Sequence, residues 1–495
     1  MPRFRVRPHA LGIFAALAVR FLTGWSLLPS AQAQQAGGSP KIVRSSAGSI
    51  PPIKTADLPS PVFAPPGTEL YWAKRGDSVV SVARQNVRRT SYLTSSELAE
   101  AIRQTNHRSG NNLKAGDALI IPGILPAPVV EKSIPVAKNF EVRAIYLTGV
   151  MAGSDHGIRI IKHWREVGGN AVVFDIKDSD GSVNIPFDHP LAGRQHVYLR
   201  DVPKFAHFLH AQGMHAIARI AIFRDQRLVE AHPELAVQSH RTGKAWRENG
   251  KLVWTDTSNP NVQEYNIALA NYVAGLGVDE IQFDYVRFPA EGDQKDATFY
   301  FQTAHPAWHR SDVITDFLKR AYAELHPKGV LLSLDVFGVM AWQRPVDLSH
   351  TGQDIVGMAK YCDVLSPMIY PSHFFGMDGY AHPGDAPEHF IGESMDRFKL
   401  ITKDSGVVLR PWLQAFHWRT KTYSPEYIET QVRVAKEKGG VGFLFWNAGN
   451  DYSKPYAAMP VMRAAKEKKY FRGDEMPGIA AAPATTASAG TGGGQ

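Results

Sequence analysis

The chain has 495 residues, which is more than one hydrophobic core usually supports, so two or more domains are expected. Its composition, 44% hydrophobic and 21% charged, excludes a wholly disordered chain and a membrane-embedded bundle. The formal charge is +8, and removing the four arginines of an expected signal segment leaves +4, an excess too small and diffuse to indicate nucleic acid but compatible with anionic envelope polymers.

The N-terminus predicts export. An apolar run at 11–28 follows three arginines, and Ala31-Gln32-Ala33 has the small-x-small pattern of a cleavage site. Residues 1–33 are therefore predicted to be a signal peptide, which places the protein in the periplasm or at the cell envelope. Arg20 interrupts the apolar run and disfavours the alternative of a retained membrane anchor. Residues 34–66, rich in Pro, Ser, Ala and Gly, are predicted to be a flexible linker.

A small module is expected at 67–123, in the order strand, helix, helix, strand. The first strand is predicted at 69–74, and helices are predicted to begin at Ser78 and Ser95, where apolar residues recur at helical spacing. The closing strand lies in the run LKAGDALIIPG (113–123). This pattern predicts a small α+β (βααβ) fold.

The module resembles a LysM domain. The likeness rests on the Gly76-Asp77 turn after the first strand, on Asn106 after the second helix and on the closing run. The resemblance implies binding to N-acetylglucosamine-containing chains such as peptidoglycan. Extra residues at 87–94 depart from the LysM pattern and could alter the glycan groove. The alternative is a degenerate LysM fold kept as a spacer.

A large domain is predicted at 140–471, between a Pro-rich linker (124–139) and a disordered tail (472–495). Eight β-rich runs alternate there with helix-length segments, which is the pattern of a closed parallel (β/α)8 TIM barrel. The strands are expected at 142–149, 171–177, 215–222, 279–285, 330–336, 362–369, 407–414 and 441–446. The helices are expected near 158–168, 200–212, 261–276, 310–325, 353–360, 387–402, 425–438 and 456–468.

The chemistry of such barrels lies at the carboxyl ends of the strands. The sequence places the carboxylates of Asp175, Asp284 and Asp335 there. Carboxylates exchange protons and stabilise an oxocarbenium-like charge, and aromatic faces stack on pyranose rings, so the rim predicts a sugar site. The side chains expected to bind the substrate are Tyr146, Lys177, Arg219, Arg287, Tyr370, Gln414, Trp446 and Asn447.

Five motifs in order resemble a bacterial family of glycoside-hydrolase-like barrels, distantly related to the α-amylase-like enzymes. The motifs are FDIKD (174–178), FDYVRFP (283–289), LDVFG (334–338), SPMIYPSH (366–373) and RPWLQ (410–414). By that resemblance, Asp284 is the expected nucleophile and Asp335 the expected acid/base, with Asp175 as the reserve partner. The amylase-like enzymes usually carry Glu where this chain has Asp335.

Structural roles are the alternative for each of these residues. Asp284 could form a purely structural ion pair with Arg287 or Lys177, and Asp175 could anchor Lys177 or Arg219. Aromatic residues at strand ends often pack in the barrel instead of touching a ligand. His207 and His210, three apart on an expected helix near His215, are read as a solvated helix face because no third ligand has suitable spacing.

The sequence therefore predicts an exported glycoside hydrolase that acts on envelope or extracellular polysaccharide, with the LysM-like module raising its local concentration. The main alternative is a non-catalytic wall-binding protein with a degenerate barrel. A carbohydrate esterase or deacetylase is disfavoured because no Asp-His-His metal set is evident. No metal, cofactor or nucleotide is expected, since the single Cys362 excludes a cysteine cluster and 242–244 lack the remaining residues of a phosphate loop.

Overall fold

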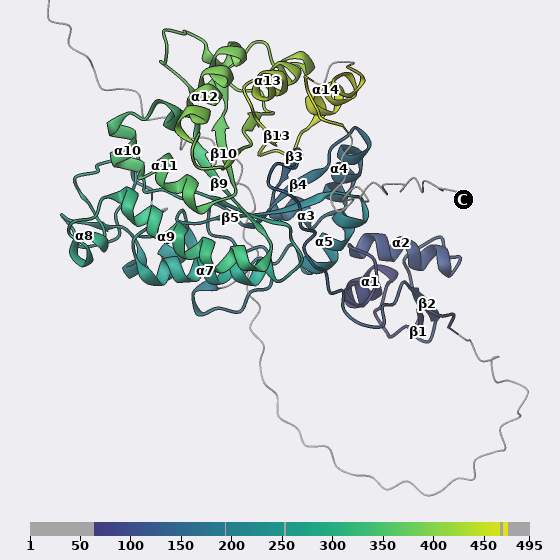
Figure 1. Ribbon diagram of the computed structural model, residues 1–495. Coiled ribbons are helices and arrows are strands. Elements are labelled where there is room, and N and C mark those ends of the chain that lie inside the picture. Colours follow the sequence, from purple (N-terminus) through teal and green to yellow (C-terminus); the bar gives the residue numbers. More distant parts are fainter. Residues whose placement is uncertain (1–63, 194, 252–253, 466–468, 474–495) are drawn as a thin grey trace, which may run out of the picture.

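Short apolar runs between residues 142 and 446 pair as eight parallel strands around a closed barrel, as predicted (Figure 1). The last strand pairs with the first, which closes the sheet. The seventh strand is in two pieces, because Pro411 between them has no N–H to donate to the ladder. The strands are β3 (Val142–Leu147), β4 (Ala171–Lys177), β5 (His215–Ala221), β7 (Glu280–Asp284), β9 (Leu331–Phe337), β10 (Val364–Ile369), β11 (Val408–Leu409) with β12 (Trp412–Gln414), and β13 (Gly442–Trp446).

This computed structural model describes residues 64–193, 195–251, 254–465 and 469–473. The expected signal peptide (1–33), nearly all of the linker after it and most of the expected tail lie outside the described residues. Within the described part, no helix has the length and apolar character needed to span a bilayer.

Side chains alternate along the strands between two buried environments. Outward-facing residues such as Phe174 and Phe283 join a large apolar cluster with the surrounding helices. Inward-facing residues such as Val142, Ala144 and Val173 form a smaller cluster inside the barrel. Because both faces are covered, the strands read as nearly continuous apolar runs.

Helices follow the strands and cover the outside of the barrel (Figure 1). Their starts carry ordinary caps; in α7, for example, the Asn259 side chain accepts a backbone hydrogen bond and Pro260 is the first helical residue. The covering helices are α4 (Asp155–Glu166), α5 (Val202–Ala211), α7 (Pro260–Ala274), α9 (Arg310–Leu325), α11 (Ile355–Met358), α12 (Pro387–Ile401), α13 (Pro425–Glu437) and α14 (Ser453–Ala464). Shorter elements lie in the loops: α3 (Gly149–Ala152), α6 (Gln226–Ala231), α8 (Phe301–Ala304), α10 (Pro345–Thr351), and the strand pair β6 (Gln238–Ser239) and β8 (Ala297–Thr298).

The N-terminal module has the predicted order of elements. Two antiparallel strands flank two helices that begin at capping boxes on Ser78 and Thr94. The elements are β1 (Thr68–Trp72), α1 (Val79–Asn86), α2 (Ser95–Thr105) and β2 (Ala118–Pro122). A short 3-10 turn, Val87–Arg89, occupies the start of the extra length before α2.

The module is seated on the barrel near the first turns of α4 and α5. Lys204, buried in α5, donates to the carbonyl of Val87 at 2.9 Å and to that of Tyr92 at 3.3 Å. The hydroxyl of Thr94 donates to Asp155, the first residue of α4. In a (β/α)8 barrel the helices begin at the end where the strands finish. The module therefore lies beside the rim that carries the predicted site.

The segment 124–139 between module and barrel, here called the strap, is held against α5. The carboxylate of Glu131 contacts His207 at 2.7 Å and His210 at 2.9 Å, and His210 also contacts Asp279 at 3.0 Å. The expected solvated face is therefore wrong for His210, whose side chain is only 6% exposed. The sequence could not show this, because Glu131 is distant along the chain.

Replacing Glu131 with Gln should weaken the contact between the strap and α5, and the loss of stability should depend on pH. Burial opposes the imidazolium form, but hydrogen bonds to Asp279 and Glu131 outweigh it and raise the pKa of His210. Stability from this charge is present below the ordinary histidine pKa of about 6.5 and is lost as the pH rises through the raised value. We expect a loss of about 1 kcal/mol in unfolding free energy at about pH 5.5, shrinking by about pH 8.5.

Urea unfolding at the two pH values measures the effect. The matched control is Glu166→Gln, which removes the exposed partner of His163. A surface pair of this kind contributes little, so the control should change stability by less than about 0.5 kcal/mol. Equal losses in both variants, or a larger loss for Glu131→Gln at the higher pH, would contradict the expectation.

Candidate active site

Four charged side chains project into the barrel from neighbouring strands, each at an inward position near the carboxyl end. Asp175 of β4 pairs in register with Arg219 of β5, and Asp284 is the last residue of β7. Asp335 lies in β9. Because side chains alternate with a period of two, these residues continue the rows whose earlier members form the interior apolar cluster. The strands thus bring the three predicted carboxylates together.

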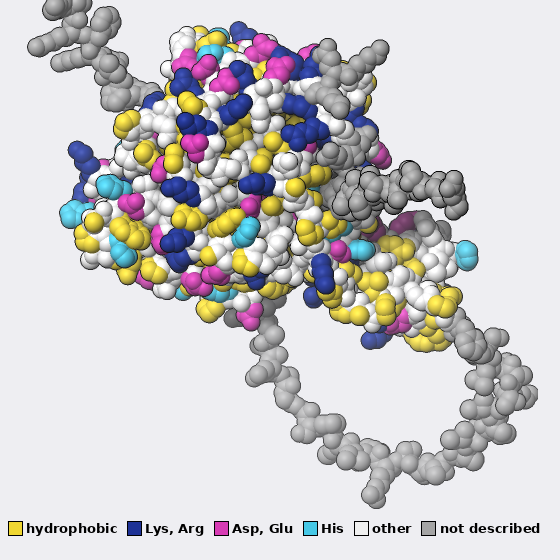
Figure 2. All heavy atoms as spheres, in the orientation of Figure 1, with side chains coloured by type: hydrophobic (Ala, Val, Ile, Leu, Met, Phe, Trp, Pro, Cys, Tyr) yellow, Lys and Arg dark blue, Asp and Glu magenta, His cyan; other side chains and the backbone are white. Residues whose placement is uncertain are grey.

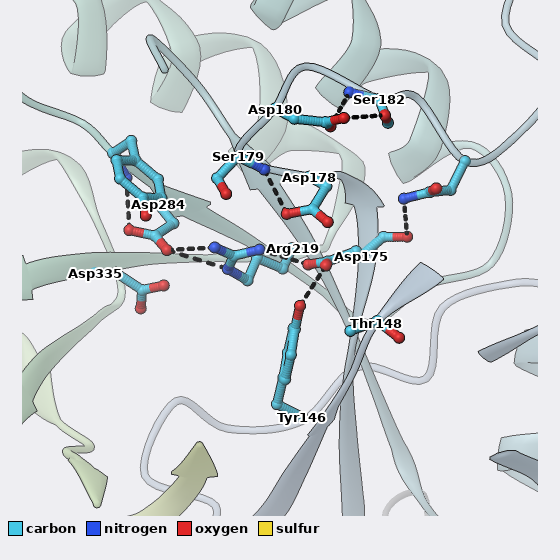
Figure 3. A network of polar contacts seen from close by, with 12 residues as sticks. Tyr146, Thr148, Asp175, Asp178, Ser179, Asp180, Ser182, Arg219, Asp284 and Asp335 are labelled. Carbon is cyan, nitrogen blue, oxygen red and sulfur yellow. Dashed lines mark hydrogen bonds and ion pairs between the residues drawn. The ribbon is translucent and has the colours of Figure 1, made fainter. Parts of the chain in front are cut away.

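Arg219 bridges two of these carboxylates. Its Nη1 donates to Asp175 at 2.5 Å, while its Nη2 and Nε donate to one oxygen of Asp284 at 2.6 and 3.1 Å (Figure 3). The other oxygen of Asp284 accepts from the backbone N–H of Tyr285 at 2.6 Å. The side chains are nearly buried, with 2% of Arg219 and 9% of Asp284 exposed. The fork geometry fixes the orientation of both carboxylates.

Asp335 has no arginine partner within hydrogen-bond distance among the described residues. It accepts a hydrogen bond from the indole Nε1 of Trp412 at 2.7 Å. Burial, and then the neighbouring charge of Asp284, raise the pKa of Asp335 well above its usual value. Asp335 is therefore the carboxyl group that keeps its proton most readily.

Asp175 is the third carboxyl group of the site, and it is bonded to both Arg219 and Tyr146. Burial raises the pKa of Asp175 to about 7, although Arg219 and the Tyr146 hydroxyl favour its ionised form. Tyr146 donates to it at 2.5 Å. One arginine is thus shared by two carboxyl groups, one of which can take up a proton near neutral pH.

Aromatic rings form one wall of the site. Trp446, only partly buried, stacks on Tyr146 with ring centroids 4.1 Å apart, and the Arg219 guanidinium lies 5.2 Å from the Trp446 ring centre. Trp412 meets Trp446 edge-on at 5.7 Å. Tyr370 is buried in the same interior cluster, and burial followed by the charges of Asp335 and Asp284 raises the pKa of its hydroxyl.

Lys177 does not join the other predicted residues. Strand alternation predicts it on the same side as Asp175, but the register of β4 against β5 shifts between the two. The bulge turns Lys177 toward α7, where it is fully buried and pairs with Asp225 at 2.7 Å. It also lies 5.1 Å from the ring centre of Tyr265. Its position gives a structural role in place of the expected substrate contact.

Gln414 and Asn447 hold loops at the rim. The amide of Gln414 donates to the carbonyl of Phe416 at 3.0 Å and accepts from the backbone of Ser372 at 3.2 Å. Asn447 donates to the carbonyl of Ala415 at 2.6 Å. These bonds engage the groups that were expected to bind sugar hydroxyls. Arg287 lies at the end of β7, enclosed by aromatic rings.

Asp178 and the indole N–H of Trp412 are parts of the site that sequence reasoning did not assign. The charge of Asp178 contributes to the raised pKa of Asp175, and Figure 3 shows its carboxylate near Arg219. Its place in FDIKD, three residues after Asp175, was the only signal available. Trp412 belongs to the motif RPWLQ, which gave no sign that its indole nitrogen would reach Asp335.

A cavity of about 340 Å³ lies apart from the bridged carboxylates. Its lining comes from the loops after β4 and β5 and from α7, and includes Gly181, Asp225, Arg227 and Tyr265. Asp225 there is already paired with Lys177. Among the described residues, no group of three or more His, Cys, Asp or Glu side chains is arranged to hold a metal ion.

The barrel and its three inward carboxylates at the carboxyl ends of the strands have the arrangement of a glycoside-hydrolase-like domain. A model of the family described as "Putative glycosyl hydrolase domain" matches residues 144–452, and the chain belongs to this family. No curated protein sequence matches the chain significantly.

Three solved structures illustrate the likeness in fold. A hypothetical protein from Ruminiclostridium thermocellum is 35% identical, with 39% of this chain and 97% of that chain covered and a TM-score of 0.35. The PgaB (BpsB) glycoside hydrolase domain from Bordetella bronchiseptica is 14% identical, with 64% and 98% covered and a TM-score of 0.48. The spore cortex-lytic enzyme SleL from Bacillus megaterium is 12% identical, with 81% and 86% covered and a TM-score of 0.39. All three scores are below 0.5, so the fold assignment rests on the strand pairing.

Proposed function

We propose that this protein is an exported glycoside hydrolase that cleaves a polysaccharide of the cell envelope or its surroundings. The observation that carries the proposal is the unlike state of two neighbouring carboxyl groups. Asp284 is ion-paired with Arg219, whereas Asp335 has a pKa raised by burial and by the charge of Asp284. Environments that separate two carboxyl groups in this way suit an acid and an anion acting together.

In the proposed reaction, Asp335 protonates the oxygen of the leaving sugar while Asp284 attacks or stabilises the anomeric carbon. The glycosidic C–O bond breaks, and its electrons and the proton leave with the departing sugar. Water then adds to the anomeric carbon and returns a proton to Asp335; where Asp284 had formed a covalent bond to that carbon, this bond breaks and its electrons return to the Asp284 carboxylate. Trp446 offers a partly exposed aromatic face for stacking a sugar ring.

The ion pair between Asp284 and Arg219 is the observation that could favour a non-catalytic barrel. Full neutralisation of both Asp284 and Asp335 by arginine would favour it. Arg219 is instead shared between Asp284 and Asp175, and Asp335 has only the neutral Trp412 partner. Asp335 therefore offers a proton beside the ion-paired carboxyl group of Asp284, which supports the catalytic proposal.

We also propose that the module binds N-acetylglucosamine-containing glycan, with peptidoglycan as the first candidate. The module's seat near the first turns of α4 and α5 supports this role, because a glycan strand held by the module would lie near the rim of the barrel. Lys and Arg side chains are scattered among acidic ones over the face drawn in Figure 2, so that face offers no basic stripe for nucleic acid.

Incubation of the purified protein with peptidoglycan and a panel of polysaccharides tests the proposal. We expect release of new reducing ends from at least one polymer, with products identified by mass. The control is a variant that carries both Asp284→Asn and Asp335→Asn. Release that is equal in the control, or absent with every polymer, would contradict a hydrolase.

A further inference from the structure

Arg287 is a buried cation without a contacting counterion. It follows Asp284 by three residues and is only 9% exposed. Its guanidinium lies 4.5 Å from the ring centre of Trp254 and 4.3 Å from that of Phe337, and its Nη1 donates to the carbonyl of Phe288 at 3.0 Å. Among the described residues it forms no ion pair. Burial lowers the pKa of Arg287, and the through-space charges of Glu248 and Asp284 offset this effect only in part.

A second arginine lies beside it. Arg224, partly exposed and three residues beyond the end of β5, donates to the hydroxyl of Tyr285 at 3.1 Å and also lacks an ion pair within the described residues. The Arg287 guanidinium lies 5.7 Å from the ring centre of the same tyrosine and 4.5 Å from that of Trp254. Tyr285 has a positive φ of 55°, a strained conformation for a tyrosine. The ring centre of Tyr285 lies 5.2 Å from the Arg224 guanidinium and 5.7 Å from that of Arg287, so both arginines border the same aromatic ring.

The carboxylate whose charge acts most strongly on both arginines is Glu248, and it is already engaged. Glu248 accepts from the indole nitrogen of Trp254 at 2.6 Å and from the backbone of Glu291 at 3.2 Å. Its charge acts on both arginines through space without touching either. Within the described residues, neither guanidinium is therefore neutralised by a carboxylate in contact with it.

Buried charged groups are rarely left unpaired, because desolvation of an isolated ion is costly. We propose that Arg287 and Arg224 bind a carboxylate group carried by the glycan substrate, so that the enzyme acts on an acidic sugar chain. This inference rests on the proposed function, since it names the substrate class of the same site. The aromatic rings of Tyr285, Trp254 and Phe337 provide the apolar surface on which the sugar that bears the carboxylate can lie.

The surroundings favour a single negative charge over a doubly charged phosphate. Asp284, Asp178 and Glu248 all act on these arginines, and their repulsion grows with the charge of the ligand. A carboxylate also matches the planar guanidinium fork. Two carbohydrate sources supply this chemistry: the carboxylate of a uronic acid, and the lactyl carboxylate of peptidoglycan strands freed of peptide.

Binding measurements with paired ligands test the inference. The probes are polygalacturonate oligosaccharides and peptide-free peptidoglycan strands, each compared with its carboxyl-reduced form. Isothermal titration calorimetry uses the full chain carrying Asp335→Asn, so that hydrolysis does not consume the ligand. Carboxyl reduction should weaken binding of one class by about tenfold or more. The class that responds identifies the source of the carboxylate.

The arginine variants make the test specific. Arg287→Gln and, separately, Arg224→Gln should weaken binding of the carboxylated ligand. The affinity for the carboxyl-reduced ligand should stay unchanged within about twofold. Arg224→Gln keeps the test valid if loss of the buried Arg287 impairs folding, which circular dichroism reveals. The matched control is Arg241→Gln, an exposed arginine paired with Asp293, which should bind as the parent does.

Two results would overturn the carboxylate site: equal binding of carboxylated and reduced forms in both classes, or a loss with Arg241→Gln as large as with Arg224→Gln. The outcome is separable from that of the proposed hydrolase. If the protein binds the carboxylated form more tightly but never releases reducing ends, the hydrolase proposal is contradicted and the carboxylate site is supported. If the protein cleaves only neutral glycans, the hydrolase proposal is supported and the carboxylate site is contradicted.

Discussion

Asp335→Asn is expected to lower kcat on a natural polysaccharide by about 10³-fold, because the leaving sugar then departs without a proton. Asparagine keeps the volume of the buried side chain and can still accept from the Trp412 indole. The loss should depend on the leaving group. An activated aryl glycoside departs without help, so the variant should retain most of the wild-type rate of glycosidic cleavage on that substrate.

The pH profile provides a second readout of the same role. An acid must be protonated to act, so wild-type kcat/KM is expected to be present below the raised pKa of Asp335 and to fall as the pH rises through it. This alkaline limb should disappear from the variant's profile with the aryl substrate. Burial raises the pKa of Asp175 to about 7, so its ionisation adds a further negative charge to the site near neutral pH.

Asp284→Asn is the matched control for the acid assignment. The carboxylate at 284 acts at the anomeric carbon, so its loss should lower the rate with both kinds of leaving group. If Asp335→Asn impairs the aryl glycoside as severely as the polysaccharide, or keeps the alkaline limb, Asp335 is not the acid.

Much of the barrel could be predicted because its signals are local. Apolar runs of strand length recur eight times between helix-length segments. The residue ranges expected for the strands and for the helices match those of the structure closely. The inward positions of Asp175, Asp284 and Asp335 follow from the period of two, once each strand end is known. The bridging partner of Asp284 was misplaced, since the sequence pointed to Arg287 or Lys177 and the structure places Arg219 there.

What the sequence did not reveal depends on single departures from regular structure and on distant contacts. The bulge after Asp175 has no clear signature, yet it redirects Lys177 out of the barrel. The hydrogen bonds that engage Gln414 come from loop carbonyls whose paths are set by packing. The contact between Glu131 and His210 joins a strap to a helix 79 positions later. Periodicity carries no information on such pairs.

Arg219→Leu is expected to destabilise the barrel by about 3 to 5 kcal/mol, because two carboxyl groups then share a buried site without a counterion. Asp175 is fully buried and Asp284 is 9% exposed at the side chain, so water cannot replace the lost guanidinium. The loss should be smaller at about pH 5.5 than at about pH 8.5, since the unpaired carboxyl groups take up protons more readily at the lower pH.

Urea unfolding followed by tryptophan fluorescence measures this change, because Trp412 and Trp446 lie close to Arg219. The matched control is Arg227→Gln, which removes an exposed ion pair with Asp180 and should cost less than about 1 kcal/mol. Adding Asp175→Asn and Asp284→Asn to Arg219→Leu removes the stranded charges and should restore part of the stability. If Arg219→Leu costs no more than the control, or if the added asparagines bring no recovery, the bridge does not hold the two carboxylates in place and the proposed catalytic geometry loses its support.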